Sequence, residues 1–203
     1  DAPDAIYRWE WQSARLLKDQ GEAEAAMAAY RRAIETFQEL RLDFARGFGN
    51  LAPEAVFDGA EESFEEGPGA LFFELAALLL QKESSLKVPA AKQECLEEVL
   101  RTIESLRSAE LEDYLHDACV RRSTRVESIA ARSAVLYVIP FRDRLELLVG
   151  FPDGTKAFRL ERFGSAVSKA ELKRTTGQLR ELLETRPTFY FKDTTVGTPT
   201  ISI

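Results

Sequence analysis

The stretch Ser133–Leu160, SAVLYVIPFRDRLELLVGFPDGTKAFRL, decides the fold, because here the apolar spacing changes from helical to strand-like. The first run is β-branched and aromatic, which is typical of a strand buried on both faces, and Pro140 ends it. Arg142-Asp143 has the length of a hairpin connection, and Pro152-Asp153-Gly154 is a turn signal. The stretch therefore predicts an antiparallel meander that needs partners to bury its faces. The three expected strands are 134–139, 145–151 and 155–160.

The composition is that of a soluble globular protein, with 45% hydrophobic and 30% charged residues in a chain of 203. A net charge of −7 with scattered basic residues argues against nucleic acid, because phosphate contacts need clustered Lys and Arg. The longest apolar run, Ala70–Leu80, is too short to span a membrane. Cys95 and Cys119 do not form a disulfide framework, so we expect a cytoplasmic, reducing compartment. Because the first residue is not Met, removal of an upstream segment from this chain is an alternative that the sequence leaves open.

Helical periodicity precedes the meander. Gly21 separates the first two helices, and Pro89 stands at the first turn of a later one. The segment 52–69, rich in Gly, Pro and acidic residues, is predicted to be a connecting loop. The basic segment 121–132 links the helices to the meander. The helices expected in this part are 6–18, 22–40, 68–82 and 90–106. The second continues helically through 42–48 and the last through 108–115.

A capped helix is predicted after the meander. Ser168 and Glu171 have the spacing of a capping box, in which the Ser side chain accepts a backbone N–H and the Glu reaches back. We expect this helix to run to about Glu184. Its inward-facing residues would be Leu172, Leu179, Leu182 and Leu183. Residues 185–203 fit either a last strand or a tail.

Few residues have the spacing of a chemical site. His116 and Cys119 are three residues apart and resemble a Cys–His dyad, but the alternative is a small buried Cys beside a polar His. With one His in the chain, they fall short of a zinc site. The sequence therefore predicts no catalytic residue, no cofactor and no metal site. Four aromatic residues either line a peptide-binding groove or belong to the core: Trp9, Trp11, Tyr30 and Phe37.

The first hairpin resembles a tetratricopeptide repeat, in which small residues let two helices approach and an aromatic side chain fills the groove. Glu10 stands where the first Trp of that pattern is usual, and Gln38 replaces its final Pro. The matching positions are Ala14, Leu17, Gly21, Ala26, Tyr30 and Ala33. The resemblance implies a protein or peptide partner.

The chain from about Trp9 to Thr185 resembles bacterial CHAT proteins, in which a caspase-like cysteine peptidase domain follows tetratricopeptide helices. The segment Glu110–Val120, ELEDYLHDACV, the meander and the capped helix that starts Ser168-Lys169-Ala170-Glu171-Leu172 carry this resemblance. Nothing here matches the catalytic His and Cys motifs of the family. The resemblance therefore assigns no catalytic residue, and it marks Cys119 as structural.

Together these patterns predict an α+β chain with three parts: a tetratricopeptide-like helical region (1–120), a basic linker (121–132) and the start of a CHAT-like domain (133–203). The expected function is the regulatory, protein-binding portion of a CHAT protein, inactive as this chain. The alternative is a stand-alone tetratricopeptide-type binding or oligomerisation module without peptidase relation. We further expect the isolated chain to associate through the sheet edge that carries Val135, Tyr137 and Ile139. The sequence indicates no nucleic-acid or membrane partner.

Overall fold

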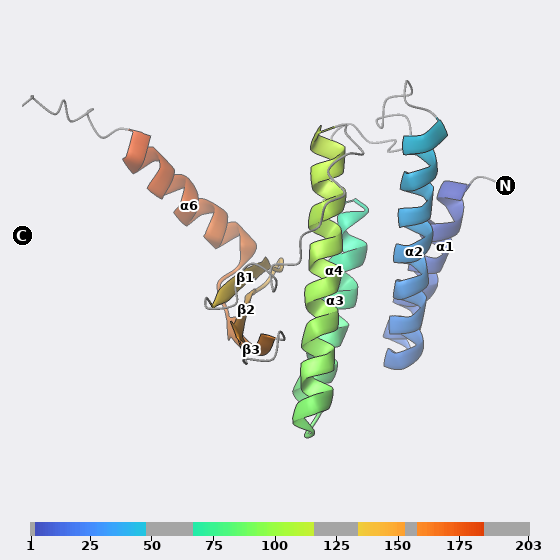
Figure 1. Ribbon diagram of the computed structural model, residues 1–203, viewed down its shortest axis with the longest axis horizontal. Helices are drawn as coiled ribbons and strands as arrows, with labels where there is room; N and C mark the ends of the chain where they lie inside the picture. The colour runs from blue at the N-terminus through green and yellow to red at the C-terminus, as the bar shows by residue number, and fades with distance from the viewer. Residues whose placement is uncertain (1–2, 48–66, 116–133, 153–157, 185–203) are drawn as a thin grey trace, which may run out of the picture.

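The computed structural model describes residues 3–47, 67–115, 134–152 and 158–184. Over these residues it shows two antiparallel helical hairpins, a three-stranded antiparallel sheet and one further helix (Figure 1). The expected α+β class is confirmed. The predicted linker 121–132, the tail 185–203 and most of the loop 52–69 lie outside the described residues.

The first hairpin consists of α1 (Pro3–Asp19) and α2 (Ala23–Gly47). Gly21 makes the tight turn between them with a φ of 82°, a left-handed conformation that favours glycine. Hydrogen bonds from Gly21 N to Lys18 O (3.0 Å) and from Glu22 N to Leu17 O (2.9 Å) close the end of α1. The segments expected at 22–40 and 42–48 form one continuous helix that ends at Gly47.

The second hairpin consists of α3 (Gly69–Ser85) and α4 (Pro89–Leu115). The two segments expected at 90–106 and 108–115 form one continuous helix. The helix α3 lies between α2 and α4, and this position explains why its sequence is apolar nearly all round. Its buried residues include Leu71, Phe72, Leu75, Ala76, Leu79 and Leu80.

Small residues let the helices of the first hairpin pack closely. Ala14 of α1 and Ala33 of α2 are fully buried. The larger side chains then meet between the hairpins, where the Phe37 ring of α2 contacts the Phe72 ring of α3 edge-on at 6.1 Å. One hydrophobic core therefore continues from the first hairpin into the second and on to the inner face of the sheet.

The sheet consists of β1 (Val135–Pro140), β2 (Leu145–Pro152) and β3 (Phe158–Ser165) in the order β1-β2-β3. All pairs are antiparallel, as predicted. The strand β3 extends past its predicted end at Leu160, because the pairing with β2 continues to the pair Leu145↔Ser165.

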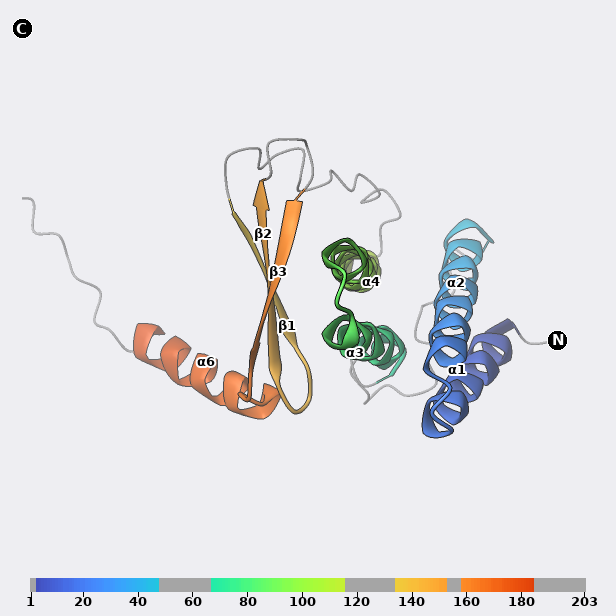
Figure 2. The ribbon, with the colours of Figure 1, turned by 90° about the horizontal axis from the view of Figure 1, so that it is seen from below.

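One face of the sheet packs on the second hairpin, and the other is uncovered by described residues (Figure 2). Tyr137, Ile139 and Leu148 point toward the hairpin and are buried. Leu136, on the opposite face, is 57% exposed. The expectation that β1 is buried on both faces is therefore wrong for the described structure, because side chains alternate along a strand and helices cover one side.

The last described helix is α6 (Lys169–Glu184), which projects away from the end of the sheet (Figures 1 and 2). The Glu171 backbone N donates to Ser168 Oγ at 3.2 Å, so the predicted N-terminal cap is present. Lys169 N also donates to Arg142 O of the β1–β2 turn at 3.4 Å. Leu179 is 57% exposed, so its predicted inward orientation is wrong. The side chains of Leu182 and Leu183 lie outside the described part.

Candidate interaction site

The four aromatic residues proposed as a groove do not lie on one open surface. Tyr30 and Phe37 are buried in the core, where Phe37 contacts Tyr7 at 5.2 Å as well as Phe72. Trp11 is partly buried, whereas Trp9 is exposed on α1. Tyr30 and Phe37 are therefore core residues. Trp11 and Tyr30 meet at a carboxylate to which both donate a hydrogen bond.

That carboxylate belongs to Glu74 on α3. It accepts hydrogen bonds from Trp11 Nε1 (2.9 Å), Tyr30 Oη (2.9 Å) and the Arg15 guanidinium (2.6 Å from Nη2 to Oε1). The Arg15 guanidinium also lies over the Trp11 ring, 4.2 Å from its centroid. One side chain of α3 is thus held by two residues of α1 and one of α2, and this contact links the two hairpins.

These contacts determine the charge state of Glu74. Burial alone would raise the pKa of this carboxyl group, but the hydrogen bonds from Arg15, Trp11 and Tyr30 outweigh that effect and lower the pKa. Burial and the neighbouring carboxylate raise the pKa of the Tyr30 phenol. Glu74 therefore stays ionised and Tyr30 neutral around neutral pH, which suits a structural contact better than proton transfer.

A shallow groove of about 330 Å³ lies between α2 and α4. The ion pair between Arg31 Nε and Glu98 Oε1 (2.6 Å) crosses it, and Gln38 donates to Ser105 further along. The floor is formed by Leu75 of α3. This mixed-charge surface can bind an extended polar peptide only by exchanging its own contacts.

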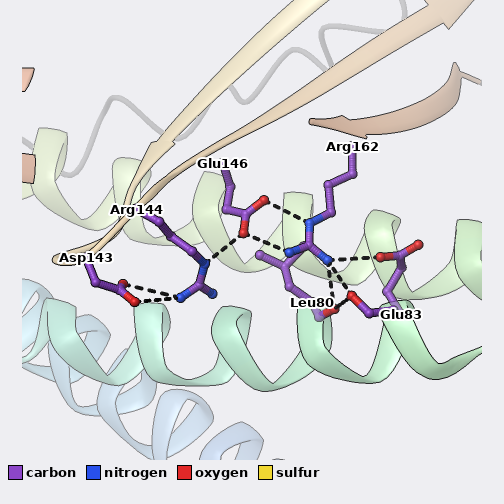
Figure 3. A network of polar contacts seen from close by, with 7 residues as sticks. Leu80, Glu83, Asp143, Arg144, Glu146 and Arg162 are labelled. Carbon is purple, nitrogen blue, oxygen red and sulfur yellow. Dashed lines mark hydrogen bonds and ion pairs between the residues drawn. The ribbon is translucent and has the colours of Figure 1, made fainter. Parts of the chain in front are cut away.

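The second charged centre joins the sheet to α3 (Figure 3). Glu146 points inward from β2 and is 1% exposed. Arg162 of β3 donates to both of its oxygens, Nε to Oε2 and Nη2 to Oε1, each at 2.8 Å. Arg144 Nε donates to Oε1 at 2.8 Å. The remaining nitrogen of Arg162, Nη1, reaches the α3 carbonyl oxygen of Leu80 at 2.9 Å.

The joint defined by Arg144, Glu146 and Arg162 continues on α3. Arg162 Nη1 also lies 3.1 Å from Glu83 Oε2 and 2.8 Å from Ser84 Oγ. Burial alone would raise the pKa of Glu146, but the hydrogen bonds from Arg162 and Arg144 outweigh it and lower the pKa. Because the carboxylate is already saturated with donors, it serves as a structural anchor.

The helix α4 caps one polar group on each edge of the sheet. Arg107 Nη2 donates to the Val138 carbonyl oxygen of β1 at 3.0 Å. At the other edge, the Leu160 backbone N of β3 donates to Gln93 Oε1 at 3.1 Å. Both edges therefore carry a blocked backbone group, which reduces pairing with other strands.

The side of the sheet that points away from the second hairpin carries several apolar side chains. Val138, Leu147 and Phe163 form one row across the three strands, and Leu136 lies opposite Val149 in the next row. Leu136 and Phe163 are more than half exposed, the latter 51%. We define the outer face by these five residues. Leu147 and Val149 are half-buried, and Glu161 completes the second row on β3. Neighbouring apolar side chains in such rows, edged by charge, are typical of an interaction surface.

No family model, no curated protein and no solved structure matches this chain.

The described residues show no metal centre: none of them form a group of three or more His, Cys, Asp or Glu side chains that could hold an ion. His116 and Cys119 lie outside the described part, so their proposed dyad stays a prediction. Cys95 is a buried free thiol whose pKa is raised by burial, which makes it a packing residue. Among the described helices, none combines the length and apolarity that crossing a bilayer requires.

Sequence reasoning missed the three residues that organise these contacts. Glu74 interrupts the apolar run of α3, and a lone acid inside a buried helix must find donors. Glu146 occupies a position of β2 that alternates onto the inner face, and Arg162 lies two residues from the inward Leu160 on β3. The strand period was thus the available signal for an inward-facing ion pair.

Proposed function

We propose that this chain is the regulatory, protein-binding portion of a CHAT-type protein. Its helical hairpins bind a protein partner, and its sheet begins a caspase-like domain whose catalytic His and Cys motifs are absent from this chain. It is inactive by itself, works in the cytoplasm and takes no cofactor. The proposal rests on the resemblance of the sequence from Glu110 to Leu172 and on one structural observation.

That observation is the unequal treatment of the two sheet faces. The inner face is joined to the second hairpin by buried apolar side chains and by the contact of Arg162 with Glu146 and Leu80. The outer face is apolar and, among described residues, uncovered. Packing this face against the rest of a larger domain would remove its apolar side chains from water, so the outer face is suited to such a domain.

The contacts of Arg162 in the joint also connect the second hairpin to the sheet. A partner that shifts α3 must move the Leu80 carbonyl and Glu83, which hold the same guanidinium as Glu146. The contact is bidentate and buried, so it transmits a displacement rather than absorbing it. This arrangement supports a regulatory role for the helical region.

A second candidate function is a stand-alone tetratricopeptide-type binding or oligomerisation module. The groove between α2 and α4 favours it, because a mixed-charge surface fits a peptide partner without any further domain. In this case the outer face is an interface between copies of the chain.

The two candidates are separated by the coding sequence downstream of Ile203 and by one binding experiment. If the reading frame continues, the following segment is expressed as a separate polypeptide and mixed with this chain, and light scattering after gel filtration measures the complex. We expect a one-to-one complex that Phe163→Lys abolishes. Leu111→Lys, at an exposed position of α4, is the matched control and keeps binding. A stop codon, or a complex indifferent to Phe163→Lys, would support the second candidate.

A further inference from the structure

A line of exposed apolar side chains runs along the outer side of α1. Ile6 is 48%, Trp9 73% and Leu16 62% exposed, and their spacing of three and seven residues puts them on one side of the helix. We call these three residues the α1 stripe. Trp9 is not part of the hydrophobic core that the described residues form, although a Trp side chain has one of the largest apolar surfaces to bury.

The second hairpin repeats the first in length and alignment. Both α1 and α3 have 17 residues, so laying Pro3 on Gly69 also lays Asp19 on Ser85. The same alignment places Ala23, the first residue of α2, on Pro89, the first residue of α4. Five buried positions of α2 coincide with buried positions of α4, the second helix of the later hairpin, whereas Ala26 and Met27 have no buried counterpart. The coinciding pairs are Ala29 with Cys95, Tyr30 with Leu96, Ala33 with Val99, Phe37 with Ile103 and Leu40 with Leu106.

This alignment lays the α1 stripe on the side of α3 that faces the first hairpin. Ile6 corresponds to Phe72, whose ring contacts Phe37 of α2. Trp9 corresponds to Leu75, a buried residue that lines the groove beside α2.

The third member of the stripe, Leu16, corresponds to Lys82, which forms an ion pair with Glu24 of α2 at 2.7 Å. On α3, all three positions therefore lie against α2, whereas on α1 the corresponding side chains face solvent.

We propose that the α1 stripe is the docking surface for a further helical hairpin, which lays an amphipathic helix of the α2 kind against α1. The occupant presents a helix with small residues and one aromatic side chain, so that Ile6 and Trp9 insert as Phe72 and Leu75 do. This inference rests on the proposed role of the helical hairpins in binding a protein partner, and it names the kind of partner.

A second copy of this chain does not fit the same place. The side of α2 that would bind the stripe already contacts α3 through Phe37, Glu24 and Tyr30. The corresponding side of α4 contacts the sheet, where Gln93 and Arg107 bind strand backbone. The interface between α2 and α3 thus recurs at α1 only with an additional hairpin.

The experiment supplies that hairpin. A copy of residues 1–66 that carries Trp9→Phe, so that its peptide differs in mass from that of the parent α1, is placed directly before Asp1. This puts α1 at the same chain distance from the copied α2 as α3 has from α2. Hydroxyl-radical oxidation of Trp9, read by mass spectrometry, is compared with the parent chain. We expect the oxidation rate of Trp9 to fall to that of the partly buried Trp11 or below. Helix content measured by circular dichroism is expected to rise, because a helix of this length needs packing to form.

The control variants carry one substitution in the extended chain. Trp9→Asp should lower the amide protection of the copied hairpin about thirtyfold or more, because a central Trp contributes at least about 2 kcal/mol to such an interface. Val88→Asp, at an exposed apolar residue remote from α1, should leave it unchanged. Unprotected Trp9 or an unfolded copy overturns the proposal. Trp9 protection that appears in the parent chain on self-association also overturns it, in favour of a second copy. None of these results bears on the binding measured at the outer face.

Discussion

Arg162 binds Glu146 through two parallel hydrogen bonds of 2.8 Å, and its third nitrogen reaches the Leu80 carbonyl oxygen of α3. One guanidinium therefore connects two neighbouring strands with a helix far away in sequence. Glu146 is buried and has Arg144 as its other donor. Removing Arg162 leaves a buried carboxylate short of donors, and such a group is costly.

We predict that Arg162→Met lowers the free energy of unfolding by about 3 kcal/mol, because a buried ion pair loses one partner. Arg162→Lys keeps the charge but loses the bidentate geometry, and should cost about half as much. Urea denaturation followed by circular dichroism measures both. Arg159→Met removes an exposed ion pair with Glu161 from the same strand and should change stability by less than about 1 kcal/mol.

The double variant Glu146→Leu with Arg162→Met provides the second check. It removes both partners, so no charge is stranded, and it should be more stable than Arg162→Met alone. A double variant that is less stable than the single one would contradict the view that the stranded carboxylate causes the loss.

The lowered pKa values of Glu74 and Glu146 predict acid sensitivity. A Glu side chain in the unfolded chain takes up its proton at its ordinary pKa of about 4.3, whereas the folded carboxylates do so at lower pH. The contribution of both groups is therefore fully present above about pH 5 and is lost as the pH falls through their folded pKa values. Urea midpoints measured between pH 3 and pH 7 should decline toward acid.

Glu146→Gln tests which group causes that decline. The variant should be about 2 kcal/mol less stable than the parent at pH 7, since a hydrogen-bonded charge is replaced, and the gap should narrow below pH 4. Glu22→Gln changes an exposed carboxylate and serves as the control. A gap that stays constant from pH 7 to pH 3 would show that the ionisation of Glu146 does not contribute.

The elements could be predicted because their signals are local. Helical spacing, Gly21 and the Ser168 cap located the helices, and the change of period at Ser133 located the meander. What could not be predicted depends on which side of each element a neighbour covers. Leu179 has the spacing of a buried residue, yet α6 extends from the sheet and leaves it exposed. The spacing of apolar residues shows that a face exists, whereas its occupant comes from tertiary packing.

The same limit applies to the candidate site. The spacing of Tyr30 and Phe37 fits groove aromatics as well as core aromatics, although core is the more frequent case at helical spacing. Only the position of α3, which brings Glu74 to the Tyr30 hydroxyl, distinguishes the two. The correspondence between the α1 stripe and the buried side of α3 also needs the structure, because the sequences of the two helices differ at every aligned position.

Two glycines give a matched pair of predictions. A Cβ on Gly164 would lie 3.3 Å from Glu146 Oε2, which two arginines hold in place, so it cannot move away easily. Gly164→Ala should therefore cost about 1 kcal/mol. Gly177 lies inside α6 with no atom within 4 Å of the added Cβ, so Gly177→Ala should stabilise that helix by up to about 1 kcal/mol. Urea denaturation and helix content measure the two effects. If both variants changed the free energy of unfolding in the same direction, Glu146 would not be held as tightly as its hydrogen bonds indicate.

Substitutions on the outer face should change binding without changing the stability of the fold. Phe163→Lys changes a half-exposed side chain and should alter the free energy of unfolding by less than about 1 kcal/mol. Ile139→Ala, on the buried face of the same sheet, should cost about 3 kcal/mol through the cavity that it leaves. Denaturation of the two variants side by side tests the assignment. A large loss for Phe163→Lys would mean that the outer face is covered.

The capped edges of the sheet give the last prediction, which concerns self-association. Arg107 occupies the Val138 carbonyl on β1 and Gln93 the Leu160 backbone N–H on β3. Replacing both by Ala frees one acceptor and one donor, and unpaired groups on a sheet edge promote pairing with a second chain. We expect Arg107→Ala with Gln93→Ala to associate at lower protein concentration than the parent, as measured by light scattering. Arg101→Ala, at an exposed position of α4, should behave like the parent. If the double variant and the parent associate equally, the edges do not mediate association, and the outer face remains as its surface.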